Sequence, residues 1–289
     1  MGQRRPFELP AFMTCRLECK WAGTLVRSNG FMMWHPHAMP TPLELARALV
    51  DARRQGHSLD ESEWEAAVAA TPDAYAVQEA VLDALDGQPA LAWKSGGPSR
   101  ESPLTHAPLP RAGLLRSGAT LAPLPSGRRI VEAEIALKLG RDVTAQEAGQ
   151  CTHETAAEWV SGFAPAIEVV DSRWAKGLDC GPLLKLADHQ GHGALVLGEF
   201  VPYRPVDWTA QECSVTLGDT TQTFVGTHAL RHPAWHGAAR SAAATRNGAT
   251  IPAGTVVTTG TWCGLLPVPA GTRVRVAFPG IGDVSVRLD

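Results

Sequence analysis

Two stretches in the first third of the chain carry apolar residues at helical spacing. In residues 41–56 the apolar stripe is Leu45, Leu49 and Ala52, and residues 71–87 repeat the same spacing. Each stretch opens with a Thr-Pro pair, which provides an N-cap and a proline at the first helical position, and each ends at a glycine. The pattern predicts two amphipathic helices that act as packing elements.

After residue 128 the pattern changes to short apolar runs, some of which alternate with polar residues. The segments "TRVRVAF" and "DVSVRL" alternate as half-buried strands do. Between these runs, a capping box formed by Thr144 and Glu147 predicts a helix over residues 144–162, and residues 232–248 read as another. The predicted strands are Ile130–Leu139, Ala166–Asp171, Ala194–Leu197, Cys213–Leu217, Gln222–Val225, Thr255–Thr259, Thr272–Phe278 and Val284–Leu288.

These elements predict an α+β protein with three regions. Residues 1–40 lack helical or strand periodicity, and we interpret them as a disordered leader or as the product of a mis-assigned start codon. Residues 41–90 form a helical N-terminal part. Residues 91–289 form a β-rich domain, although the Gly-, Pro- and Ser-rich residues 94–128 at its beginning indicate loops.

Composition and charge narrow the possible classes. The 289 residues are 44% hydrophobic and 19% charged, as is typical of a globular protein with a sizeable core. A net charge of -3 and a pI of about 6.4 indicate neither nucleic acid nor an anionic membrane as a partner. The chain contains no run of 18 or more apolar residues, so we expect no transmembrane helix. Six scattered cysteines with no signal peptide before them predict reduced thiols in a cytoplasmic protein.

The predicted strand "VEAEIALKLG" contains two acidic residues, Glu132 and Glu134. Residues i and i+2 of a strand face the same side, so both carboxylates lie on one face and Val131, Ala133 and Ile135 lie on the other. The two Cα atoms are then roughly 7 Å apart, which lets both side chains reach one ion. Buried carboxylates repel each other unless a cation or a proton lies between them. The pair alone is compatible with a metal site or with an ordinary solvated strand face.

A third acidic residue makes the metal hypothesis stronger. Glu168 lies within the apolar run "APAIEVVDSRW", where a buried carboxylate needs a partner or a ligand. A set of three carboxylates without neighbouring Cys or His suits a hard divalent cation such as Mg²⁺ or Mn²⁺ rather than zinc.

Several segments occur in an order that resembles a known family. They are "VEAEIALKLGRD", "PAIEVVDSRW", "LADHQGHGALVLG" and "AGTVVTTGTWCGLLPVPAGTRVRVAFPGIGDVSVRL", with "AYAVQEAV" and "ALAWKSGG" earlier in the chain. Together they resemble the fumarylacetoacetate hydrolase superfamily, and within it the 2-keto-4-pentenoate hydratase / 4-oxalocrotonate decarboxylase branch. The resemblance covers roughly residues 41–289. It implies a mixed β-roll or barrel for the β-rich domain, and a homo-oligomer.

The resemblance also implies roles for individual residues. It implies a Mg²⁺ or Mn²⁺ site formed by Glu132, Glu134 and Glu168. Lys94 matches the Lys of a "WK(I/V)G" segment, which binds substrate or transfers a proton in such enzymes. Thr259 and Gly260 match a "TG" pair that borders the site.

Two departures from the family pattern leave the acid–base groups open. Asp188 matches the Asp of an "ADN" segment, but His189 replaces the Asn. The family also carries an Asp shortly after the Lys segment, whereas residues 102–110 read "SPLTHAPLP". His106 in this segment is a candidate replacement, because its imidazole titrates near neutral pH.

Arg173 has two possible roles. It follows Asp171 closely and can form an ion pair with it. It can instead bind a substrate carboxylate, which an arginine does well through two parallel hydrogen bonds.

The resemblance implies a small-molecule 2-oxo acid as the substrate, since its carboxylate and carbonyl oxygens chelate one cation. The cation then stabilises an enolate, which serves hydration, decarboxylation or C–C hydrolysis equally well. We therefore expect a hydratase or decarboxylase of 2-oxo or 2-hydroxy alkenoic acids, such as 2-hydroxypenta-2,4-dienoate, in aromatic catabolism. The alternatives are an acylpyruvate-type hydrolase and a non-catalytic metabolite-binding protein.

Overall fold

The computed structural model describes residues 23–28, 31–36, 39–124, 126–236 and 248–289. Residue contacts divide the chain into two compact units, Met1–Met39 and Pro40–Asp289. The described part of the first unit is an antiparallel hairpin of β1 (Gly23–Ser28) and β2 (Phe31–Pro36), where the sequence pattern had predicted no strand. The predicted helical and β-rich parts both belong to the second unit.

The helical part of the second unit confirms the two predicted helices. Helix α1 (Pro42–Gln55) has the capping box at Thr41 and ends at Gly56 in the left-handed conformation. Helix α2 (Thr71–Asp86) also ends at a left-handed glycine, but Thr71 is its first residue rather than its cap. Both pack against the short helix α5 (Pro182–Ala187) through one apolar cluster that includes Leu45, Leu49, Val77, Val81 and Leu184.

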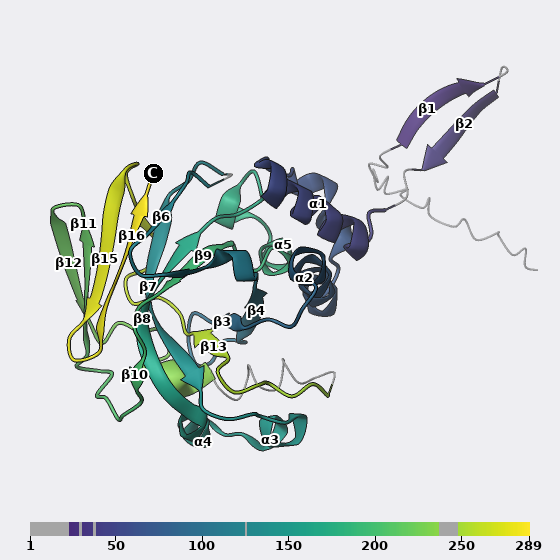
Figure 1. The fold of residues 1–289 in the computed structure, drawn as a ribbon. Coiled ribbons are helices and arrows are strands. Elements are labelled where there is room, and N and C mark those ends of the chain that lie inside the picture. The colour runs from purple at the N-terminus through teal and green to yellow at the C-terminus, as the bar shows by residue number, and fades with distance from the viewer. Residues whose placement is uncertain (1–22, 29–30, 37–38, 125, 237–247) are drawn as a thin grey trace, which may run out of the picture. The chain divides into compact units, whose positions relative to one another are not determined.

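Most of the strands form one large mixed sheet, which curls through the middle of this unit (Figure 1). Its strands run in the order β4-β3-β13-β7-β8-β9-β5, and two short strands pair with β8 and β7. Their bounds are β3 Ala92–Gly96, β4 Thr105–Leu109, β5 Leu114–Arg116, β7 Ile130–Leu139, β8 Val160–Val170, β9 His192–Leu197, β10 Val201–Pro202, β13 Val256–Thr258 and β14 Leu266–Pro267.

A five-stranded sheet lies on one side of the large sheet, and the helices α1, α2 and α5 lie on the other (Figure 1). Its strands run in the order β12-β11-β15-β16-β6. Their bounds are β6 Ala119–Leu121, β11 Glu212–Leu217, β12 Thr220–Val225, β15 Thr272–Phe278 and β16 Gly282–Leu288.

The main core lies between the two sheets. Val131, Ala133 and Ile135 of β7 are buried in it, together with apolar residues of β8, β15 and β16. The face alternation predicted for β7 is therefore correct, and Glu132 and Glu134 project from the opposite face of this strand. The predicted α+β class with a β-rich domain is confirmed.

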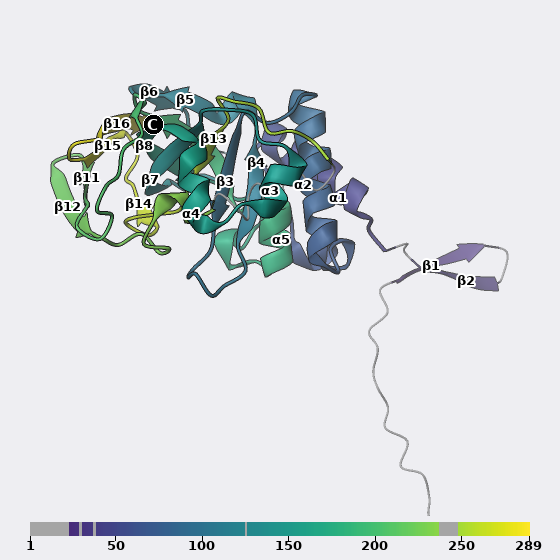
Figure 2. The same cartoon turned by 90° about the horizontal axis from the view of Figure 1, so that it is seen from below.

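Two regions differ from the sequence-based prediction. The helix predicted over residues 144–162 is two short helices, α3 (Ala145–Gln150) and α4 (His153–Ala156), after which β8 begins at Val160. At the break, the Thr152 hydroxyl accepts the Thr155 N–H and caps a new helix. Figure 2 shows α3 and α4 as two separate helices. The segment predicted as loop contains the strands β3 to β6. Proline and glycine do not prevent strand formation at sheet edges, and β4 is such an edge.

Single-turn 3₁₀ helices connect these elements at Glu61–Glu63, Glu65–Ala67, Arg111–Gly113, Ala157–Trp159, Gly177–Asp179 and Pro233–His236. The last one lies at the start of the helix predicted over residues 232–248, and residues 237–247 lie outside the described part. Of the helices that the structure describes, none is sufficiently long and apolar to span a membrane.

Candidate metal site and pocket

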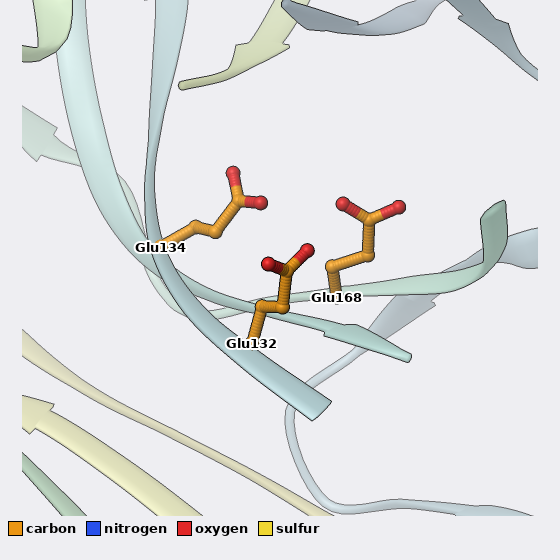
Figure 3. Close-up of side chains that lie close together, drawn as sticks. All are labelled: Glu132, Glu134 and Glu168. Atoms are coloured by element: carbon orange, nitrogen blue, oxygen red, sulfur yellow. The ribbon is translucent and has the colours of Figure 1, made fainter. Parts of the chain in front are cut away.

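Three carboxylates converge between β7 and β8 because of the strand register. The two strands are antiparallel, and Glu132 lies directly opposite Glu168. Glu134 lies two residues along β7, on the same face as Glu132. Figure 3 shows the three carboxyl groups pointing toward one common space. One ligand oxygen from each residue lies within 4.8 Å of the others, a spacing at which all three could hold one cation.

The burial of these carboxyl groups favours a bound cation or bound protons between them. Glu134 and Glu168 are buried with 2% and 0% of their surface exposed, and Glu132 is partly buried. The Oε2 atom of Glu168 is buried without a hydrogen-bond partner among the described residues. A buried anionic oxygen without a partner is costly. A hard divalent cation fits this set of oxygen donors, as Mg²⁺ or Mn²⁺ would.

The three carboxyl groups titrate very differently. Burial and the nearby Glu168 raise the pKa of Glu132 to about 7, against the opposing effect of Lys94. Burial and the other two carboxylates raise the pKa of Glu134 well above its usual value. Burial also opposes ionisation of Glu168, but Lys94 and His192 outweigh it and lower the pKa of Glu168 to about 2. Lys94 therefore offsets the charge of Glu168 most strongly, and its effect on the β7 pair is too small to outweigh burial and repulsion.

Two basic side chains hold Oε1 of Glu168. Lys94 of β3 donates from Nζ to this oxygen at 2.6 Å, and it also donates to the carbonyl of Gln190 at 3.4 Å. His192 of β9 places Nδ1 3.1 Å from the same oxygen. Burial lowers the pKa of His192 to about 4, so its ring is neutral at pH 7 and Nδ1–H is the donor. Both contacts fix the orientation of the Glu168 carboxyl group and leave Oε2 free of these two partners.

The loop after β13 closes the site from the side of β7. The N–H of Gly260 donates to Oε2 of Glu134 at 2.9 Å, and Gly260 has a φ of 103°, which a residue with a side chain rarely adopts. The hydroxyl of Thr259 donates to the carbonyl of Ile135 at 2.8 Å. Thr259 and Gly260 thus border the site, where the resemblance places them.

A pocket of about 620 Å³ opens beside the carboxylates. The predicted site residues Lys94, Glu132, Glu134, Thr259 and Gly260 all line it. Its remaining walls come from α2, α5, β3 and the segments around residues 97–105 and 229–230, with mostly apolar side chains. The pocket is thus large enough for a small organic acid, and Glu132, Glu134 and Lys94 line it together, whereas Glu168 is buried behind it.

His106 does not face this pocket directly. It is buried on β4, and Tyr75 of α2 stacks on it with ring centroids 4.5 Å apart. The Tyr75 hydroxyl lies 3.3 Å from Nδ1 of His106. Tyr75 and Thr105, the neighbour of His106, are the residues that line the pocket here. A catalytic role for His106 stays a prediction, and it would have to act through Tyr75.

Arg173 and Asp188 pair with each other behind the site. Arg173 donates from Nε to Oδ1 of Asp188 at 2.6 Å and from its backbone N–H to Oδ2 at 2.9 Å. Arg173 also lies 3.6 Å from Asp171, so the ion-pair interpretation of Arg173 agrees with the geometry. His189 is buried beside them, and burial lowers its pKa well below the usual value. None of Arg173, Asp188 and His189 lines the pocket. The catalytic roles of Asp188 and His189 and the substrate contact of Arg173 therefore stay predictions.

Sequence reasoning missed Gln190 and Tyr75, and it considered His192 only as a possible acid–base group, without its contact to Glu168. His192 contacts Glu168, Gln190 accepts from Lys94 and donates from its side chain to Thr105, and Tyr75 lines the pocket. His192 and Gln190 belong to the "LADHQGHG" segment and Tyr75 to "AYAVQEAV", both of which carry the family resemblance. That resemblance was the available signal, because no local pattern sets these residues apart.

Two curated proteins are similar to part of this chain. The chain is 33% identical over 161 residues to 2-keto-4-pentenoate hydratase 2 of Dechloromonas aromatica, which covers 54% of this chain and 58% of that protein. It is 35% identical over 161 residues to the 2-keto-4-pentenoate hydratase of Burkholderia vietnamiensis, covering 53% and 58%. These alignments span less than two thirds of the relatives' lengths.

A solved structure is similar over more of the chain. It is the 4-oxalocrotonate decarboxylase from Pseudomonas putida G7, complexed with magnesium and adipate, with a TM-score of 0.75 and 22% identity. The match covers 86% of this chain and 97% of that one, and at this identity it shows a shared fold. Residues 91–289 match the family described as Fumarylacetoacetate (FAA) hydrolase C-terminal. The chain therefore belongs to the fumarylacetoacetate hydrolase superfamily, and the curated relatives that it resembles over part of their length are 2-keto-4-pentenoate hydratases.

Proposed function

We propose that this protein is a divalent-metal-dependent hydratase or decarboxylase of 2-oxo or 2-hydroxy alkenoic acids, with Mg²⁺ or Mn²⁺ as its cofactor. The observation that supports it most is the buried cluster of Glu132, Glu134 and Glu168. Its three carboxyl groups suit a hard cation, and Oε2 of Glu168 has no hydrogen-bond partner among the described residues. The names of the curated relatives and the magnesium complex of the structural neighbour support the same proposal.

The residues around the pocket have distinct tasks in this proposal. A divalent cation held by the three carboxylates would polarise the carbonyl of a 2-oxo acid and stabilise negative charge on its oxygen. Lys94 keeps Glu168 ionised and lines the same pocket, so its ammonium can also donate to the substrate carboxylate or transfer a proton. The Gly260 N–H fixes the rotamer of Glu134. The apolar walls reduce the access of water to the reacting atoms.

One lining residue bears on the choice between the two reactions. Lys185 of α5 lines the pocket, and no carboxylate of the described residues forms an ion pair with it. Its position would suit a substrate with a second carboxylate at its tail, such as 4-oxalocrotonate, because an ammonium attracts an anion. This observation favours decarboxylation, whereas the curated relatives favour hydration.

A direct assay tests the function. The purified protein with Mn²⁺ is incubated separately with 2-hydroxypenta-2,4-dienoate, 4-oxalocrotonate and an acylpyruvate, and ultraviolet absorbance and products are followed. Turnover of the first indicates a hydratase, release of CO₂ from the second a decarboxylase, and cleavage of the third the alternative C–C hydrolase. If calorimetry detects no Mn²⁺ binding, the metal-dependent proposal fails. Binding of Mn²⁺ and of these acids without turnover would instead support a non-catalytic binding protein.

A further inference from the structure

Two arginines outside the pocket lining meet at the backbone carbonyl of His192. Arg53 of α1 donates from Nη2 to this oxygen at 2.9 Å, and Arg173 donates to it from Nη1, also at 2.9 Å. The ring of His192 is fully buried and lies 3.1 Å from Oε1 of Glu168. The backbone of His192 is thus held by the arginines while its side chain contacts a proposed metal ligand.

This arrangement costs electrostatic energy, which the surroundings offset. Burial and the charge of Arg173 lower the pKa of Arg53 to about 9, while Asp188 and Asp171 raise it. Arg173 is neutralised by its short contacts with Asp188. Two like charges therefore converge on one carbonyl only because two carboxylates lie beside them. Packing alone would not need such a network.

The segment that ends at His192 has an unusual backbone. His189 and Gln190 have φ values of 50° and 57°, and Gly191 follows with 72°. Residues with side chains rarely adopt this left-handed region, so neighbouring contacts must hold them there. The Gln190 carbonyl inside this turn accepts from Lys94. The turn therefore positions partners of both Lys94 and Glu168.

We propose that Arg53 is a positioning residue of the metal site. Its hydrogen bond to the His192 carbonyl holds the turn of residues 189–191 and the ring of His192, which together orient Glu168 and Lys94. The inference rests on the proposed metal-dependent function. It assigns the N-terminal helix α1 a role in the site, although no residue of this helix lines the pocket.

The chain supplies a matched control in the next residue. Arg54 is an exposed arginine of the same helix and also donates to a backbone carbonyl, that of Ala84 in α2, at 3.0 Å. The two arginines share chemistry, helix and type of hydrogen bond. They differ in whether that bond leads to the metal site.

The experiment compares R53M and R54M with the unmodified full chain. Mn²⁺ affinity is measured by calorimetry, and amide hydrogen exchange of residues 188–193 is measured without metal. We expect R53M to weaken Mn²⁺ binding about 10-fold, the usual effect of losing a partner of a metal ligand. It should also speed exchange in residues 188–193. R54M should change neither, and R53K, which keeps a cationic donor, should recover most of the affinity.

The outcomes separate the two proposals. Absence of Mn²⁺ binding by the unmodified protein overturns the proposed function, whatever the variants do. Normal affinity and normal exchange in R53M overturn the role of Arg53, and so does an equal loss in R53K. If circular dichroism shows that R53M does not fold, R53Q replaces it, because its shorter amide keeps a polar side chain that cannot span the same distance. Normal Mn²⁺ affinity in R53Q would then overturn the inference.

Discussion

At the scale of single residues, the two oxygens of Glu168 have different environments. Oε1 accepts from Lys94 and lies beside His192, whereas Oε2 has no hydrogen-bond partner among the described residues. Glu134 differs again, because its one polar contact in the described part is the Gly260 N–H. Glu168 is thus charge-balanced by the protein, and Glu134 is the ligand that most needs a cation.

The substitution E134Q tests that difference. The amide keeps an oxygen for the Gly260 N–H, so the fold should persist, while one anionic ligand is lost. We expect Mn²⁺ affinity to fall about 100-fold or more, because ligand charge sets affinity at such sites. The metal-free variant should melt at a higher temperature at pH 8, since folding no longer has to raise the pKa of a buried carboxyl group. E212Q, which changes the exposed first residue of β11, is the control. Unchanged Mn²⁺ affinity in E134Q would exclude the cluster as the metal site.

The raised pKa values predict how the site depends on pH. Glu132 and Glu134 hold protons in the metal-free fold at a pH where the unfolded chain has released them. The folded state therefore binds more protons, and these two groups lower the free energy of unfolding as pH rises from about 4.5 through about 7. A cation must displace the protons, so Mn²⁺ affinity should increase between pH 6 and pH 8. Calorimetry in two buffers of different ionisation enthalpy measures the released protons; a pH-independent affinity with no proton release contradicts the assignment.

At the scale of elements, the antiparallel pairing of β7 and β8 creates the site. It places Glu132 opposite Glu168, while the parallel pairing of β3 with β13 brings Lys94 beside the same space. A shift of one residue in the pairing of β7 with β8 would turn the acidic face of one strand into the core. Helices α2 and α5 then supply the opposite wall of the pocket.

Helix α5 offers a test of the substrate tail. In K185M the pocket loses the ammonium group of Lys185 and keeps its apolar lining. The KM for a dicarboxylate such as 4-oxalocrotonate should therefore rise about 10-fold, while the KM for 2-hydroxypenta-2,4-dienoate stays the same. K176M, an exposed lysine between β8 and α5, serves as the control. Equal changes for both substrates would show that Lys185 does not select the tail.

At the scale of the whole molecule, Pro40–Asp289 holds both sheets, the helices and the complete candidate site. The earlier residues belong to a separate unit. A homo-oligomer and a cytoplasmic location remain predictions at this scale, from the family resemblance and from the cysteine pattern.

Deleting residues 1–38 tests the independence of the second unit. We expect unchanged Mn²⁺ affinity and turnover, because every side chain of the site lies after residue 40. Deleting residues 1–56 should instead cause a large loss of stability, since it removes the buried residues Leu45 and Leu49 together with Arg53. Circular dichroism and calorimetry compare the two; a loss of Mn²⁺ binding in the shorter deletion would show that the first unit contributes to the site.

The sequence alone determined what local rules govern. The period of two along β7 put Glu132 and Glu134 on one face and Val131, Ala133 and Ile135 in the core, and the Thr-Pro and Gly signals bounded α1 and α2. The ordered segments indicated the family, and with it the acidic cluster and Lys94. These features depend on neighbours within a few residues or on shared ancestry.

The tertiary structure decided what depends on long-range contacts. Strand register placed Glu168 opposite Glu132. Packing paired Arg173 with Asp188 away from the pocket, although Arg173 was a candidate for substrate binding and Asp188 for catalysis. It also brought His192 to Glu168 and Arg53 to His192, which no sequence spacing indicates. A buried charged side chain takes whichever opposite charge or polar group the fold brings within reach, and that choice is made by folding rather than by position in the chain.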